Sequence, residues 1–288
     1  MITHFFLLES VKKIKDNKKM EERSLCVSGG GAKAVTLLGL LYEIHARGQL
    51  DKVNIFSGCS AGAFICALYI VGINPIQQLK YFPQITDLKF DLSAFQIFIE
   101  KVGMNRIQKY TKKFRQVIED KIGIQDPTLK EFYEATGKTF YISAVNTTKC
   151  KIIYFNHKDY PDIKLFDAIH ASAALPGVFI PVKIKGSSFI DGGYYNSFPL
   201  EPLVDTDTIG VCFSKPVFDD GLFGEMLKIA KLHIYIAKKE AIKRHPNLEL
   251  YECTSTFGLL DLDKTKMELL DEFNHGRQQH PQYYKQNA

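Results

Sequence analysis

One serine stands where a strand-like run turns abruptly into a helix-forming run. Ser60 lies at the centre of Gly58-Cys59-Ser60-Ala61-Gly62, a Gly-x-Ser-x-Gly pattern that follows the apolar run 53–56. The pattern is typical of a nucleophile elbow, in which a cramped turn exposes the serine Oγ and the following helix lends partial positive charge to an oxyanion. The same letters also occur in ordinary tight turns. Whether Ser60 is a nucleophile or part of an ordinary turn therefore depends on the other motifs in the chain.

A second glycine-rich turn comes about thirty residues earlier. Ser28-Gly29-Gly30-Gly31-Ala32-Lys33-Ala34 follows the strand-like run 24–27. The backbone N–H groups of such a loop can hold a phosphate or an oxyanion. The Walker pattern fails because Ala34 follows Lys33, and the dinucleotide pattern fails because Ala34 stands in place of its last glycine. We therefore predict that Gly29, Gly30 and Gly31 form an oxyanion hole, that Lys33 faces solvent or anchors the loop, and that no nucleotide is bound.

A third motif places a carboxylate at the end of an apolar run. Asp191-Gly192-Gly193 follows the run 188–190. An aspartate at a strand end, with the backbone bent sharply behind it, can act as a base. Asp-Gly-Gly is also a common turn, so this motif alone leaves both interpretations open. Three histidines, at His45, His233 and His245, are predicted to be structural, the first as a cap at a helix end.

The elements around the first two motifs form a βαβ unit. A helix over 35–47, ending at Gly48, joins the two strands, which predicts a parallel pair with a right-handed crossover. Both glycine-rich turns then lie at the same carboxyl edge of one sheet, where α/β folds place their sites. Further strands are predicted at 138–146, 152–156, 208–213 and 248–253, and further helices at 76–81, 94–101, 105–122, 128–134, 165–174, 222–244 and 264–277.

The composition indicates a folded globular chain. Hydrophobic residues make up 45% of its 288 residues and charged residues 24%. A net charge of +5 is compatible with an anionic membrane surface but is too small for a nucleic-acid binder. The six cysteines show no Cys-x-x-Cys spacing and are predicted to be reduced core residues. No apolar stretch is long enough to span a bilayer, so we predict a cytoplasmic protein that contacts membranes from the side.

Some stretches carry no motif but allow two interpretations. Residues 1–22 form a basic extension that is either a solvated terminus or an arm on anionic lipid, and the first is favoured. The apolar stretch 90–104 is either core cover or a lid over an acyl chain. The basic run 106–115 is either a solvated helix face or a surface for lipid headgroups. Residues 278–288 form a polar tail, and no composition shift divides the chain between the two ends.

Taken in order, the three motifs resemble those of the patatin-like phospholipase family. Residues 29–33 are similar to the family's oxyanion loop, 58–62 to its elbow, 191–193 to its Asp-Gly-Gly/Ala, and 171–177 to its stretch upstream of that aspartate. The resemblance covers residues 23–277 and implies one catalytic domain there. It implies a three-layer α/β/α sandwich around a mostly parallel sheet. It also implies a dyad without histidine, in which Ser60 is the nucleophile and Asp191 its base.

The resemblance further implies the reaction. Members hydrolyse acyl esters of phospholipids or neutral glycerides, which would proceed here through an acyl-enzyme and needs no metal or cofactor. The chain departs from the family at Ala34, where glycine is common. A Cβ there costs about 1 kcal/mol or more if the backbone needs a positive φ, and is harmless if the residue is helical, which we expect. His170, where the family often has a basic residue, is predicted to be structural.

Two rivals to this function remain open. The first is a catalytically weak or inactive patatin-fold regulator that binds lipid or a protein, for which Ala34 is the main support. The second is a serine peptidase or a hydrolase of small esters, which would share the elbow and differ in substrate. The preferred headgroup and the oligomeric state are not encoded in these motifs.

Overall fold

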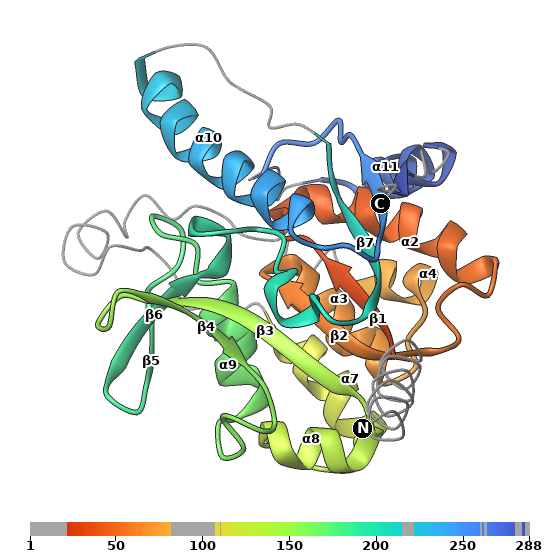
Figure 1. The fold of residues 1–288 in the computed structure, drawn as a ribbon. Helices are drawn as coiled ribbons and strands as arrows, with labels where there is room; N and C mark the ends of the chain where they lie inside the picture. Colours follow the sequence, from red (N-terminus) through yellow and green to blue (C-terminus); the bar gives the residue numbers. More distant parts are fainter. Residues whose placement is uncertain are drawn as a thin grey trace, which may run out of the picture.

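A mixed sheet runs through the middle of the molecule (Figure 1). The computed structural model describes residues 22–81, 107–109, 111–214, 222–259, 261, 264–279 and 284–285. The strands are β1 (Arg23–Val27), β2 (Val53–Cys59), β3 (Thr139–Asn146), β4 (Lys151–Phe155), β5 (Val182–Ile184), β6 (Ser187–Asp191), β7 (Asp207–Phe213), β8 (Leu248–Cys253) and β9 (Tyr284–Lys285). The helices are α2 (Ala34–Ala46), α3 (Ala61–Ile70), α4 (Pro75–Gln78), α7 (Lys112–Ile122), α8 (Leu129–Thr136), α9 (Leu165–Ser172), α10 (Leu222–Lys243) and α11 (Lys266–Gln278). Short 3-10 turns are η1 (Gly31–Lys33), η2 (Leu79–Tyr81), η4 (Ile107–Lys109), η5 (Gly192–Tyr194) and η6 (Glu201–Leu203).

The strand order is β5-β6-β3-β2-β1-β7-β8-β9, with β4 paired to β3. The central strands β3, β2, β1, β7 and β8 are all parallel, as the βαβ prediction requires. The strands β4, β5, β6 and β9 pair antiparallel with their neighbours. The mostly parallel sheet predicted from the sequence is therefore confirmed.

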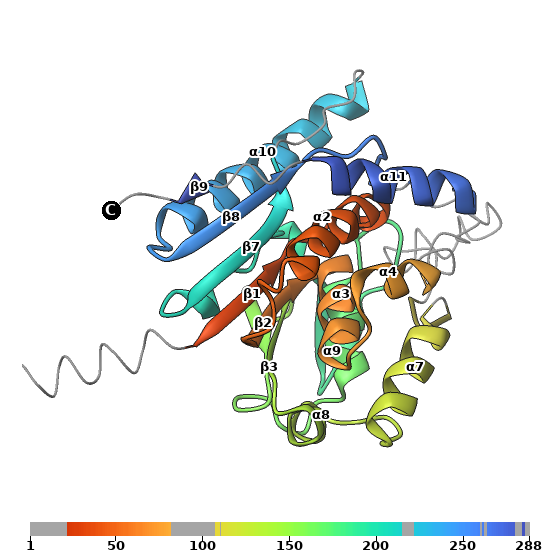
Figure 2. The same ribbon diagram turned by 90° about the vertical axis from the view of Figure 1, so that its right-hand side faces the viewer.

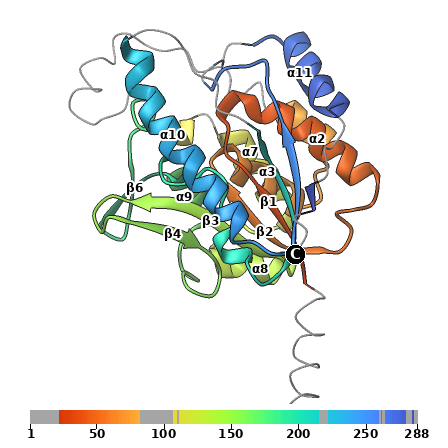
Figure 3. The ribbon, with the colours of Figure 1, turned by 45° about the horizontal axis from the view of Figure 1, so that its top comes forward.

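Helices cover both faces of this sheet, as successive residues of β1 show. Leu25 and Val27 point into a large core shared with α2, α3 and α9. Cys26, between them, points into a second core with Ala241 and Ile242 of α10. This alternation follows from the two-residue period of a strand. Figure 2 shows α2 and α3 on one side of the strands and α10 on the other, and Figure 3 shows α10 lying across the sheet. The layers are those of an α/β/α sandwich.

Helix α11 packs directly on α2 (Figure 2). A Cβ added at Gly39 of α2 would lie 2.0 Å from the Phe273 carbonyl oxygen, and one added at Gly276 of α11 would lie 2.1 Å from that of Thr36. Only glycines allow the two backbones to come so close. The C-terminal helix is thereby fixed against the helix that follows the glycine loop.

The predicted elements agree with the structure apart from local differences. The helix predicted over 105–122 begins later, because Thr111 has non-helical backbone angles and α7 starts after it. Two residues of the predicted polar tail, Tyr284 and Lys285, instead pair with the edge of β8, whose backbone groups offer partners. Residues 1–21, the stretch 90–104 with the predicted helix 94–101, and the rest of the tail beyond residue 279 lie outside the described residues. In the described ranges, no helix has the length and apolar character needed to cross a bilayer.

Candidate active site

The elbow around Ser60 is held by close packing of backbone on backbone. Ser60 joins β2 to α3 with φ 51° and ψ −124°, a conformation that non-glycine residues rarely adopt. A Cβ added at Gly58 would lie 2.8 Å from Ala63 N, and one added at Gly62 would lie 2.3 Å from the Val27 carbonyl oxygen. Such strain persists only where the surroundings over-determine it. The two glycines of the predicted motif are therefore required by the turn itself.

Asp191 reaches this elbow because β2 and β6 meet end to end along β3. Cys59, the last residue of β2, pairs with Ser143, and Asp191, the last residue of β6, pairs with Ala144. Strand β4 pairs with the same part of β3 and takes its other edge. The two strands therefore run toward each other on one edge and stop at adjacent positions. Ser60 follows directly, and its side chain acts on the Asp191 carboxyl group to lower its pKa.

The Asp191 carboxyl group is buried, with 4% of its surface exposed. Its Oδ1 accepts a hydrogen bond from Gly193 N at 2.7 Å and one from the Cys59 thiol at 3.7 Å. Burial raises the pKa of Asp191 to about 6, although the Ser60 side chain and the hydrogen bonds from Gly193 and Cys59 act in the opposite direction. At pH 7 the group is mostly ionised and is a stronger base than an ordinary aspartate.

One stretch of chain holds both members of this pair. Ser60 N donates to Ser172 Oγ at 2.8 Å. Asp191 N donates to the carbonyl oxygen of Ala174 at 3.0 Å. Both acceptors belong to the stretch 171–177, which the sequence singled out only by its resemblance. The sequence analysis missed the role of Ser172, and the available signal was a lone hydroxyl within an apolar helix.

The glycine loop lies beside the elbow but uses fewer of its amides than predicted. A Cβ added at Gly29 would lie 3.3 Å from Ser60 Cβ. The Gly29 N–H donates to the Ser197 carbonyl oxygen at 2.8 Å, so it does not point to an oxyanion in this structure. Within the described ranges, the N–H groups of Gly30 and Gly31 make no hydrogen bond. The Gly29 amide is therefore engaged elsewhere, contrary to the prediction, and the role of the Gly30 and Gly31 amides as oxyanion donors stays a prediction.

The backbone of the rest of the loop shows whether the Cβ of Ala34 causes strain. Ala34 has φ −62° and ψ −14° and begins α2, so its Cβ causes no strain. The residue with a positive φ is Gly31, at 54°. The Lys33 ammonium lies 4.6 Å from the centre of the Phe213 ring, a contact that favours the second of its two predicted roles, anchoring the loop, over facing solvent. The same ring abuts Gly30, where an added Cβ would lie 2.4 Å from it.

The turn after Asp191 is equally tight. A Cβ added at Gly192 would lie 2.5 Å from the Ser143 carbonyl oxygen, on the strand that positions both catalytic candidates. Gly193 supplies the amide that bonds Asp191. Of the two predicted motif glycines in this turn, Gly192 is required for steric reasons and Gly193 donates a hydrogen bond.

No described histidine hydrogen bonds to either member of the pair. His170 is buried and its Nε2 lies 2.7 Å from Thr111 Oγ1. Burial, with a contribution from Arg115, lowers the pKa of His170 to about 4, so the ring is neutral at pH 7. His245 is likewise buried, and its Nε2 lies 2.8 Å from the carbonyl oxygen of Leu203. Both agree with the predicted structural roles.

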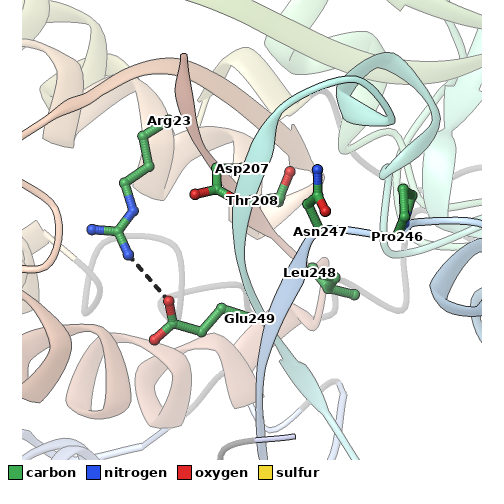
Figure 4. A pocket seen from close by; sticks show the side chains of 7 residues that line it. All are labelled: Arg23, Asp207, Thr208, Pro246, Asn247, Leu248 and Glu249. Atoms are coloured by element: carbon green, nitrogen blue, oxygen red, sulfur yellow. Dashed lines mark hydrogen bonds and ion pairs between the residues drawn. The ribbon is translucent and has the colours of Figure 1, made fainter. Parts of the chain in front are cut away.

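A cavity of about 220 Å³ lies at the opposite edge of the sheet (Figure 4). It opens where β1, β7 and β8 begin, whereas the catalytic candidates lie where strands end. An ion pair between Arg23 and Glu249, 3.1 Å long, spans its side, and Asp207 and Asn247 line it. Its position and polar lining separate it from the Ser60 site.

Comparison with known proteins decides the family. A family model described as patatin-like phospholipase matches residues 25–204, which is more than half of the chain. The chain belongs to the patatin-like phospholipase family. The match contains the glycine loop, the elbow and the Asp-Gly-Gly turn. It ends before β7, so β7, α10, β8 and α11 lie beyond it.

The chain is also similar to individual proteins and to solved structures, at sequence identities of 30% or less in the examples below. A protein of invertebrate iridescent virus 6, named probable lipid hydrolase 463L, is 30% identical over 188 residues, which cover 62% of each chain. The uncharacterized protein R571 of Acanthamoeba polyphaga mimivirus is 28% identical over 231 residues, which cover 76% of each chain. Among solved structures, VipD from Legionella pneumophila is 16% identical, with a TM-score of 0.46, over 87% of this chain and 67% of that one.

Proposed function

We propose that this protein of the patatin-like phospholipase family is a lipid acyl hydrolase. It cleaves acyl esters of phospholipids or neutral glycerides with Ser60 as nucleophile and Asp191 as base, and residues 23–277 form its catalytic domain. The observation that carries the proposal is the strained Ser60 turn, which the ends of β2 and β6 bring beside a buried Asp191 carboxylate. Family membership and a relative named a probable lipid hydrolase support hydrolysis of lipid.

The first half of the proposed reaction forms an acyl-enzyme. Asp191 takes the Ser60 proton as Oγ attacks the ester carbonyl, and the raised pKa of the carboxyl group favours this transfer near neutral pH. The N–H groups of Gly30 and Gly31, together with the N-terminal end of α3, would stabilise the negative charge on the carbonyl oxygen. Asp191 then returns the proton to the departing alcohol, and the acyl group stays on Ser60.

The second half of the reaction releases the fatty acid. A water molecule gives its proton to Asp191 and attacks the acyl carbon, and the proton passes to Ser60 as the enzyme is restored. One carboxylate therefore serves both steps, which agrees with the absence of a hydrogen-bonded histidine at Ser60 or Asp191 in the described ranges. The chemistry asks for no metal or cofactor.

The surroundings of the turn fit a lipid substrate. Tyr194 and Tyr195 follow the Asp-Gly-Gly turn directly, and 54% and 46% of their surfaces are exposed. Exposed tyrosines of this kind suit the boundary between a lipid surface and water. We propose that the enzyme works as a cytoplasmic protein in peripheral contact with lipid surfaces, with no nucleic-acid partner.

The rival regulator loses its main support. It rested on Ala34 disturbing the oxyanion loop, but Ala34 is helical and unstrained. The peptidase and small-ester alternatives are separated from lipid hydrolysis by substrate. The deciding experiment incubates the protein with mixed phospholipid and neutral-glyceride micelles, with short water-soluble esters, and with peptides. Release of fatty acid from the micelles alone would support the proposal, and faster cleavage of peptide or short ester would contradict it.

Ser60→Ala is the matched variant in that experiment. It removes the nucleophile and leaves the backbone of the elbow in place, so a circular dichroism spectrum like that of the wild type would show that folding is intact. The proposal expects fatty acid release to disappear with Ser60. Equal release by both proteins would place the activity elsewhere.

A further inference from the structure

A buried carboxylate far from the motifs in sequence gathers hydrogen bonds from two separate segments. Glu272 of α11 is 2% exposed. Its Oε1 accepts from Thr36 Oγ1, from Ser255 Oγ at 2.6 Å and from Thr256 N at 3.2 Å, and its Oε2 accepts from Thr256 Oγ1. Hydrogen bonds to a charged acceptor are stronger than neutral ones, particularly when they are buried. Glu272 therefore ties these groups together firmly.

The donors come from the start of α2 and from the segment 254–259 that follows β8. Thr36 lies two residues after Ala34, where the glycine loop ends. Ser255 Oγ also accepts from Phe257 N at 3.1 Å, which closes a local turn within the segment. Farther along, Gly258 N donates to Asp261 Oδ2 at 3.0 Å. The segment is thus a hydrogen-bonded turn with Glu272 at its base.

The other end of this segment touches the glycine loop. The Leu259 carbonyl oxygen accepts from Ala32 N at 3.1 Å. A Cβ added at Gly31 would lie 2.3 Å from that same oxygen. Because Gly31 has a positive φ of 54°, the oxygen lies against the bend that sets the direction of the Gly30 and Gly31 amides. A shift of Leu259 would change where those amides point.

We propose that Glu272 is a positioning residue for the oxyanion hole. It holds the segment 254–259, whose Leu259 carbonyl fixes the loop, while its bond to Thr36 holds the helix that the loop enters. The inference rests on the proposed function, because it concerns the oxyanion hole of that reaction. Glu272 lies outside the family match over residues 25–204. This chain thus completes the hole with its own C-terminal region.

The test replaces Glu272 by glutamine. An amide oxygen has fewer lone pairs for these donors than a carboxylate, and its NH2 group would face the hydroxyl groups. Loss of a whole oxyanion donor slows reactions by about 10²–10³, so we expect partial misalignment to lower kcat by about 10- to 100-fold. KM should stay within about threefold, because a donor that acts only in the transition state affects kcat. Hydrogen exchange of the Ala32 amide should become faster, since that amide donates to Leu259.

A control variant loosens the same pair of helices away from the loop. Glu43 of α2 pairs with Arg277 of α11 at 2.8 Å. Glu43→Gln removes this pair and leaves segment 254–259 untouched, so kcat and exchange at Ala32 should match the wild type. A fall in kcat equal to that of Glu272→Gln would reduce the role of Glu272 to general helix packing and would overturn the inference.

A milder pair of variants covers the case in which Glu272→Gln does not fold. Thr256 is exposed and donates through Oγ1. Thr256→Val removes the hydroxyl group at constant shape, and we expect kcat to fall by about 3- to 10-fold, since one of several hydrogen bonds is lost. Thr256→Ser restores the hydroxyl group and should recover the rate. Equal rates for valine and serine would contradict the inference.

Two readouts separate this inference from the proposed function. Exchange of the Ala32 amide needs no turnover, and an unchanged rate in folded Glu272→Gln would overturn the positioning role on its own. Fatty acid release that does not depend on Ser60 would overturn the function. Faster Ala32 exchange together with lower kcat and unchanged KM supports both.

Discussion

The site is built from two strand-to-helix turns at one sheet edge, and they are stabilised in different ways. The elbow at Ser60 is fixed mainly by neighbours in its own βαβ unit, since Gly58 packs on Ala63 and Gly62 packs on the end of β1. The glycine loop is fixed from far away in sequence, by Ser197, Phe213 and Leu259. The proposed nucleophile is therefore positioned mainly by local packing, with one distant hydrogen bond from Ser60 N to Ser172, and the proposed oxyanion hole depends on tertiary structure.

This difference has a functional consequence. A locally strained turn forms wherever the surrounding strand and helix form, so the nucleophile is difficult to misplace without unfolding the sheet. A loop held by distant segments can be displaced while the sheet stays intact. We therefore expect substitutions at the elbow to affect stability, and substitutions in the supports of the loop to affect rate.

The largest expected effect comes from disabling the elbow's base while leaving the loop unchanged. Asp191→Asn keeps the shape of the side chain but cannot accept the Ser60 proton, and removal of a general base typically costs about 10²–10⁴ in rate. Fatty acid release should fall by that factor. Residual activity within tenfold of the wild type would mean that another group is the base.

The same variant should be more stable than the wild type at neutral pH. Because burial raises the pKa of Asp191 from 3.8 to about 6, the folded protein retains a proton that the unfolded chain has released between these values. Wild-type stability therefore falls as pH rises from about 4 to about 6, by about 3 kcal/mol at 1.4 kcal/mol per pKa unit. Urea unfolding should show Asp191→Asn gaining this amount at pH 8 and nothing near pH 4. A variant less stable at pH 8 would contradict the raised pKa.

The next largest effect is a loss of stability, expected from a substitution that disturbs the packing of the elbow. In Gly62→Ala the new methyl group would lie 2.3 Å from the Val27 carbonyl oxygen, and such overpacking costs about 3 kcal/mol or more when the backbone cannot move. Gly123→Ala is the control, because Gly123 faces open space and its positive φ is the only source of strain, so only about 1 kcal/mol is expected. Urea unfolding compares the two. Similar losses would show that the elbow is not tightly packed.

A smaller effect is expected from a change of pH, which distinguishes the contribution of the base from that of the loop. The Asp191 carboxyl group titrates and the Gly30 and Gly31 amides do not. Because the base must be ionised, kcat/KM should fall about tenfold for each pH unit below about 6 and level off above it. Initial rates of fatty acid release between pH 4.5 and 8 give the profile. A midpoint near 4 would show an ordinary aspartate, and a flat profile would exclude Asp191 as the base.

The smallest effect concerns the end of the glycine loop. Ala34→Gly restores the residue that is common in the family, but Ala34 is already helical. We expect a loss of about 0.5–1 kcal/mol in stability, because glycine is less favourable than alanine in a helix, and a kcat within twofold. A tenfold gain in kcat would show that the alanine impairs the loop after all.

The same contrast explains what could be predicted from the sequence. Gly58 and Gly62 flank Ser60 within a few residues, so the elbow, its strand and its helix are visible in the local pattern. The parallel arrangement of β1 and β2 follows from the short helical crossover between them. The local pattern places Asp191 at a strand end, but the meeting of β2 and β6 along β3 is a matter of register, which no local pattern encodes.

The loop shows where prediction failed. Three glycines suggest three donors, yet the Gly29 amide bonds to Ser197, more than 150 residues away in sequence. Glu272 and Leu259 are farther still, and nothing in their own segments marks them as neighbours of the loop. Contacts of this kind arise only when the C-terminal helix packs on α2.

The most direct measurement of the dyad is covalent labelling of the serine. The wild type is treated with a long-chain alkyl fluorophosphonate, and the modified peptide is identified by mass spectrometry, with Ser60→Ala and Asp191→Asn treated alongside. A Ser60–Asp191 dyad predicts one adduct, on Ser60, which forms far more slowly in Asp191→Asn. An adduct on another residue, or labelling of Ser60 at the same rate without the Asp191 carboxylate, would contradict it.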